Sequence, residues 1–153
     1  MPYSLTKQAD YWTSDEALYA QLDGANDLTS WFGFLHDFHD ATIQSMSFEA
    51  SSGTLVLSAF RMTSEVDDRG FFVLDRHARV TFHFDGVSGV ALDCNPLTTV
   101  LEIGLRRVTP EHLPVLNTSA SAGDYEVGFD DVCGGSGAIY AKAVRLSVQP
   151  EAE

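Results

Sequence analysis

The chain has 153 residues, of which 44% are hydrophobic, and its formal net charge is −13. This length and apolar content are sufficient for a substantial core, so we expect one folded domain and not a disordered chain. No stretch approaches the roughly 20 apolar residues of a membrane-spanning helix. The excess of carboxylates disfavours nucleic acid and anionic membrane, so we expect neither as a partner.

Two features bear on the cellular compartment. Residues 1–8 contain no apolar signal region, which predicts a cytoplasmic protein. Cys94 and Cys133 have neither metal-site spacing nor Cys-x-x-Cys spacing. We therefore expect both cysteines to be reduced, buried and small apolar members of the core.

The first forty residues show helical patterns. Thr13 and Glu16 have the spacing of a capping box, and a short helix is expected over residues 17–22, with a stop at Gly24. A second short helix is indicated by four apolar residues that share one helical face, namely Leu28, Trp31, Phe32 and Leu35.

From residue 41 onward the hydrophobic period changes to two, which indicates strands. Within residues 78–84, Ala78 and Phe82 are expected inward, whereas Arg79 and His83 are expected outward. Asp85-Gly86 is typical of a two-residue hairpin turn, so this pair is expected to separate two strands. The strands expected are residues 42–49, 54–63, 78–84, 87–94, 100–108, 125–129 and a last one that ends at Val148.

These strands number about seven and have no helical crossovers between them, so the sheet should be antiparallel. The expected fold is mainly β, bordering on α+β: an antiparallel sandwich or a partly open barrel with one or two short N-terminal helices. We expect a single domain with a helical segment over residues 1–38, a β body over 41–148 and a frayed tail over 149–153. An exposed strand edge would also allow a homo-oligomer.

The segment His36-Asp37-Phe38-His39-Asp40 concentrates four side chains that can bind metal or transfer protons. If the second helix continues, His36 and His39 share a face, and Asp40 completes the set of candidate metal ligands. A catalytic metal site usually needs three protein ligands, and an adjacent His and Asp cannot both point at one ion. The alternative is structural, with a carboxylate capping backbone amides and a histidine bonding a carbonyl. If the segment does bind a metal ion, the missing ligand would come from His77, His83 or His112.

No other motif completes a site. The glycine-rich residues 134–137 lack the Lys-Ser/Thr pair of a P-loop, and no serine lies in a nucleophile elbow. We interpret residues 134–137 as a hairpin turn. The sequence thus predicts no catalytic residue and no cofactor, and it favours a protein that is not an enzyme.

Two short motifs carry a resemblance to a group of small bacterial domains. In that group a Trp precedes a His-Asp-Ala/Ser stretch that opens the first strand, which corresponds here to Trp31 and to Phe38-His39-Asp40-Ala41-Thr42-Ile43. A later apolar-x-Phe-x-Gly-Val segment corresponds to residues 82–90, and the resemblance covers about residues 28–148. Some members resemble immunity proteins of polymorphic toxin systems, which neutralise a toxin by binding it. The resemblance therefore implies a protein partner.

Two functional hypotheses follow. The first is a non-enzymatic protein-binding module, immunity-like, whose acidic surface faces a basic protein partner, because a charge of −13 would speed encounter with such a partner. The second is a small metal-dependent enzyme or metal-binding protein centred on His36, His39 and Asp40. We favour the first, since no complete catalytic motif is found.

Overall fold

A computed structural model describes residues 12–95, 97–116 and 118–152. The expectations for residues 1–8, and the first part of the expected helical segment, lie outside the described residues. The elements are helices α1 (Glu16–Ala20) and α2 (Ala25–Phe32), the 3-10 helix η2 (Leu113–Val115), and strands β1 (Thr42–Glu49), β2 (Ser52–Val66), β3 (Phe72–Asp93), β4 (Val100–Arg107), β5 (Tyr125–Asp131) and β6 (Ser136–Pro150).

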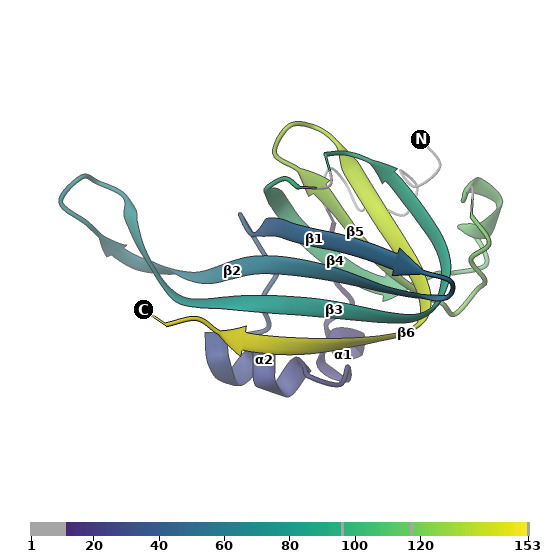
Figure 1. Ribbon diagram of the computed structural model, residues 1–153, viewed down its shortest axis with the longest axis horizontal. Helices are drawn as coiled ribbons and strands as arrows, with labels where there is room; N and C mark the ends of the chain where they lie inside the picture. Colours follow the sequence, from purple (N-terminus) through teal and green to yellow (C-terminus); the bar gives the residue numbers. More distant parts are fainter. Residues whose placement is uncertain (1–11, 96, 117, 153) are drawn as a thin grey trace.

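The strands form one antiparallel sheet in the order β1-β2-β3-β6-β5-β4. It consists of two local meanders, β1-β2-β3 and β4-β5-β6, joined where β3 pairs with β6. The sheet curves so that its two edge strands approach each other, and Thr42 forms an isolated bridge with Thr99, but the sheet does not close into a barrel (Figure 1). The predicted mainly β, antiparallel fold with two short helices is confirmed.

The hairpin expected at Asp85-Gly86 is wrong, which makes six strands and not seven. Strand β3 continues through this pair, because Asp85 and Val87 both pair with β6, opposite Ala143 and Ala141. Gly86 has a φ of 63°, so it supplies the left-handed conformation that the Asp-Gly pair favours. The ladder shifts register just after it, so the pair marks an irregularity within a strand and not a reversal of the chain.

The tail expected from residue 149 is also corrected. Gln149 and Pro150 belong to β6 and pair with Arg79 and Ala78. The backbone N–H of Glu151 donates to the carbonyl of His77. Hydrogen bonds to β3 thus hold the chain at least to residue 151.

The core lies inside the curved sheet and is covered by the two helices. The alternation expected over residues 78–84 is confirmed, because the inward side chains are almost fully buried and Arg79 is exposed. Leu28 and Phe32 of α2 are also fully buried in this core, as their helical spacing predicts. No helix among the described residues is long and apolar enough to cross a membrane.

The helix termini differ from the capping box expected at Thr13. Asp15 caps α1, and its carboxylate accepts from the backbone N–H of Leu18. Gly24, with a φ of 90°, joins the two helices and lies against the backbone of Leu146 in β6. Gly33 ends α2 in the left-handed conformation that a helix C-terminus favours.

Residues 60–77 comprise the end of β2, the start of β3 and the turn between them. They project beyond the neighbouring strands β1 and β6, and we call this segment the β2–β3 arm (Figure 1). Pairing with β1 stops at Ser58, and pairing with β6 stops at Ala78. The arm is therefore a two-stranded ribbon attached to a six-stranded sheet.

Candidate functional site

The His36–Asp40 segment runs between the end of α2 and the start of β1 and is not helical. Backbone hydrogen bonds fasten it to the opposite edge of the sheet, where Ile103 N–H donates to Asp37 O and Asp40 N–H donates to Val100 O. The helix ends at Phe32, so the expected sharing of one helical face by His36 and His39 is wrong.

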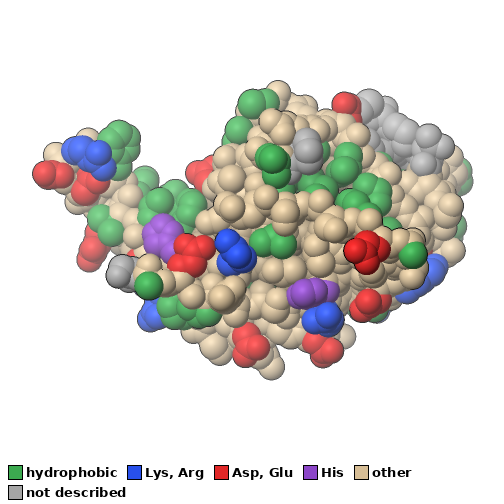
Figure 2. All heavy atoms as spheres, viewed as in Figure 1, with side chains coloured by type: hydrophobic (Ala, Val, Ile, Leu, Met, Phe, Trp, Pro, Cys, Tyr) green, Lys and Arg blue, Asp and Glu red, His purple; other side chains and the backbone are tan. Residues whose placement is uncertain are grey.

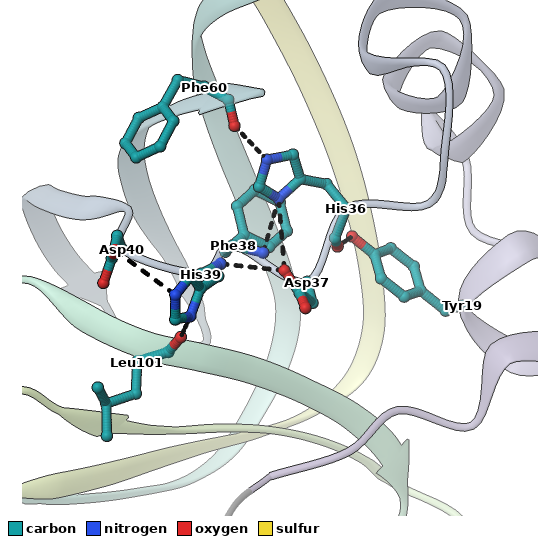
Figure 3. A network of polar contacts seen from close by, with 8 residues as sticks. All are labelled: Tyr19, His36, Asp37, Phe38, His39, Asp40, Phe60 and Leu101. Carbon is teal, nitrogen blue, oxygen red and sulfur yellow. Dashed lines mark hydrogen bonds and ion pairs between the residues drawn. The ribbon is translucent and has the colours of Figure 1, made fainter. Parts of the chain in front are cut away.

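His36 points into the protein and is 3% exposed. Its Nδ1 accepts from the backbone N–H of Phe38 at 2.7 Å, which places the ring proton on Nε2. That Nε2–H donates to the carbonyl of Phe60 in β2 at 2.5 Å (Figure 3). Both ring nitrogens of the neutral imidazole are therefore engaged, and His36 links the loop to the sheet.

Aromatic side chains enclose the His36 ring. The ring lies 4.4 Å from that of Phe32, 5.1 Å from that of Phe34 and 5.1 Å from that of Phe38, between centroids. Tyr19 of α1 donates its hydroxyl to the carbonyl of His36 at 2.7 Å. This environment fits the structural role considered for the segment and leaves His36 no nitrogen for a metal ion.

Burial lowers the pKa of His36, and the hydrogen bond to Phe60 and the charge of Asp37 offset only part of that effect. His39 acts in the same direction as burial. We expect an NMR titration to place the pKa of His36 below its ordinary value of 6.5. As the pH falls below 6.5, the unfolded chain takes up a proton at His36 that the folded protein resists, so stability should decrease until the folded pKa is passed. A pKa at or above 6.5 would contradict the buried neutral ring.

The other three polar side chains of the segment face solvent. Asp37 is 60% exposed, and its carboxylate accepts from the backbone N–H of His39. His39 is 57% exposed, and its Nδ1–H donates to the carbonyl of Leu101 at 2.9 Å. Its Nε2 lies 3.5 Å from the carboxylate of Asp40. Phe38 and Asp40 both have φ angles just above 60°, an uncommon conformation that turns His39 outward while Phe38 is buried.

The structure does not bring the candidate metal ligands together. His36 is buried, whereas His39 and Asp40 are at the surface. Among the described residues, no group of three or more His, Cys, Asp or Glu side chains is placed to hold a metal ion. The histidines considered as further ligands lie elsewhere: His77 packs near Phe60, His83 bonds Ser147 of β6, and His112 precedes η2.

A cleft of about 210 Å³ adjoins the segment and is formed by distant parts of the chain. Three carboxylates line it, those of Glu16, Asp37 and Glu102, and no lysine or arginine is among its described lining residues. Burial raises the pKa of Glu102, and the negative charge of Asp37 raises it further. His39, beside the cleft, offsets part of this effect, so the cleft is lined by carboxylates and no lysine or arginine of its described lining neutralises them.

Sequence reasoning missed Glu16 and Glu102 as members of this site. Glu102 belongs to the edge strand β4, 65 positions after Asp37, and no local motif connects the two. The available signal was weak: Glu102 is a polar residue that alternates with apolar ones, as on any solvated strand face.

Of the predicted turn over residues 134–137, Gly134 and Gly135 lie in the turn between β5 and β6, whereas Ser136 and Gly137 begin β6. In this turn Asp131 accepts from the backbone N–H groups of Cys133 and Gly135. The expectation that both cysteines are buried is wrong for Cys133, which is exposed in that turn, and Cys94 is half-buried. Both thiols are unpaired.

Comparison with known proteins gives no match: no family model fits the chain, and no curated protein and no solved structure is significantly similar to it.

Proposed function

We propose that this protein is a non-enzymatic binding module that recognises a basic protein partner through the acidic cleft beside the His36–Asp40 segment. The immunity-like role implied by the sequence motifs is the specific form of this proposal, with the protein acting in the bacterial cytoplasm and neutralising a basic toxin by binding it.

The observation that carries the proposal is the electrostatics of the cleft. Asp37 lies near enough to Glu102 for its charge to add to the effect of burial and raise the pKa of Glu102, His39 offsets part of this, and no lysine or arginine is among the described lining residues. A lysine or arginine from a partner would relieve this repulsion and gain charge-assisted hydrogen bonds. The total charge of −13 would add long-range attraction toward the same partner.

The surrounding geometry also favours binding over catalysis. His36 is committed to two backbone groups, and Tyr19 donates to a carbonyl, so neither is available as an acid or base. Burial also raises the pKa of Tyr19, which keeps its hydroxyl protonated. What remains accessible is a set of carboxylates, with the imidazole of His39 beside that of Asp40.

A double variant that removes two negative charges from the cleft tests whether the cleft is the binding site. The double variant Asp37→Asn/Glu102→Gln should bind a fluorescently labelled oligo-arginine peptide roughly 2- to 30-fold more weakly than the unaltered protein, since each exposed ion pair contributes about 0.2–1 kcal/mol. Fluorescence anisotropy at several salt concentrations measures the affinity, which should fall as salt is raised.

The matched control is Asp23→Asn/Glu49→Gln, which removes the same charges from exposed positions outside the cleft. We expect this control to retain nearly the full affinity. Equal weakening by both pairs would show that the peptide responds to net charge alone, and the cleft would not be the binding site.

A further inference from the structure

The β2–β3 arm presents an apolar face to solvent. Met62 pairs with Leu74, and Val66 pairs with Phe72. Opposed residues of antiparallel strands point to the same side, and Phe72 and Leu74 are two positions apart, so all four side chains share one face. Their exposed fractions lie between 40% and 56%. Figure 2 shows hydrophobic side chains gathered along the arm at the left of the view.

The polar groups on the other side of the arm already have partners. Arg61 donates two hydrogen bonds to the carboxylate of Asp75, at 2.8 and 2.7 Å, and this contact lowers the pKa of that carboxyl. The hydroxyl of Thr63 donates to the carbonyl of Val73. The apolar face is therefore the side of the arm that still lacks a covering layer.

The base of the arm is held at a defined position. Trp31 of α2 donates its indole N–H to the carbonyl of Arg76 at 2.9 Å, and the Arg76 guanidinium lies 4.8 Å from the centre of the Trp31 ring. A surface fixed in this way loses little conformational entropy when a partner binds.

A two-stranded ribbon alone is only marginally stable in water. Beyond Ser58 the outer edge of β2 has no strand partner among the described residues, and beyond Ala78 the same holds for β3. Packing of the apolar face against another surface would provide the stabilisation that a third strand or a helix normally gives.

The distribution of charge favours a second copy of this chain as the partner of the arm. The arm, residues 60–77, contains three arginines and four carboxylates, so it carries −1 of the total −13 and the rest of the chain carries −12. Two copies of such an acidic chain repel each other at most approaches, but they meet with least repulsion where both are nearly neutral. The arm meets this condition and also exposes an apolar face, which can pack against the same face of a second copy about a twofold axis.

We propose that the β2–β3 arm is a self-association surface, on which two copies of this chain pack the apolar faces of their arms together. This inference does not depend on the proposed function, because the arm and the acidic cleft are formed by different residues. The two also respond oppositely to salt: screening weakens cleft binding to a basic partner, but it reduces repulsion between two acidic chains and strengthens self-association.

The test places the same Leu→Asp substitution at two positions and measures the molar mass by light scattering after gel filtration, over a range of protein concentrations. The unaltered protein should approach twice the chain mass of 16.7 kDa as concentration and salt rise. Leu74→Asp on the arm face should raise the dissociation constant at least tenfold, a change of about 1.4 kcal/mol. Leu92→Asp is the matched control, since Leu92 lies outside the arm and is 42% exposed against 40% for Leu74.

A protein that stays monomeric at all concentrations would overturn the proposal, as would equal loss of the dimer in both variants. If Leu74→Asp does not fold, hydrogen exchange of the unaltered protein at low and high concentration decides the question. The amides of the arm should become protected at high concentration, and unchanged exchange there would also overturn the proposal.

Discussion

Replacing His36 with alanine is expected to lower the free energy of unfolding by about 3–5 kcal/mol. The substitution removes the partner of two groups, the backbone N–H of Phe38 and the carbonyl of Phe60. It also leaves a space among the aromatic rings of Phe32, Phe34 and Phe38. Each unsatisfied buried polar group costs roughly 1–3 kcal/mol, and the cavity adds to that cost. Urea unfolding followed by tryptophan fluorescence measures the change.

His39→Ala is the control, because it removes the same side chain three positions later. His39 is 57% exposed and makes one hydrogen bond to a carbonyl, so its loss should cost less than about 1 kcal/mol. If the two substitutions cost the same, the structural role assigned to His36 is wrong.

Replacing Gly24 with alanine is expected to destabilise the protein by at least about 3 kcal/mol. The added Cβ would lie 1.9 Å from the carbonyl oxygen of Leu146, a backbone atom that cannot move without displacing β6. The same contact region includes the hydrogen bond from Leu146 N–H to Asp23 O, which docks the helices on the sheet. The turn between α1 and α2 should therefore separate from β6, and thermal unfolding should record a large decrease in Tm.

Gly70→Ala is the control, because it measures the cost of the left-handed backbone conformation without a steric clash. Gly70 has a φ of 87°, close to the 90° of Gly24, but a Cβ added there would meet nothing within 4 Å. Only the left-handed conformation is penalised at Gly70, so we expect a loss of about 1–2 kcal/mol. A loss at Gly24 no greater than that at Gly70 would mean that the helix turn can move away from β6 at little cost.

The core strands could be predicted from the sequence because their side chains alternate. Residues 42–49 form β1 with the bounds expected, and the inward set of residues 78–84 is buried as expected. Alternation of apolar and polar residues indicates that one face of a strand is buried, so it does not predict strands whose two faces are both exposed. Residues 64–77 mix charged, glycine and apolar residues, so their sequence predicts no strand, although most of them belong to β2 and β3.

The candidate site was only partly predictable. The sequence indicates that the His36–Asp40 segment is chemically dense, but not that its two histidines face opposite directions. Their separation depends on left-handed conformations at Phe38 and Asp40, which neither residue type specifies by itself. The cleft depends on Glu102, which the curvature of the sheet brings next to Asp37.

The division of the sheet into two meanders has a consequence for how the chain reaches this structure. Within each meander the paired strands are close in sequence, the longest connection being residues 108–124 between β4 and β5, so their contacts cost less loop-closure entropy than contacts across the seam. The seam between β3 and β6 joins residues at least 43 positions apart, and the bridge between Thr42 and Thr99 closes a loop of similar length. We therefore expect the two meanders to become ordered first and the seam to form last. In this order of events Asp37 and Glu102 come together only in the last folding step, so the acidic cleft exists only in the completely folded protein.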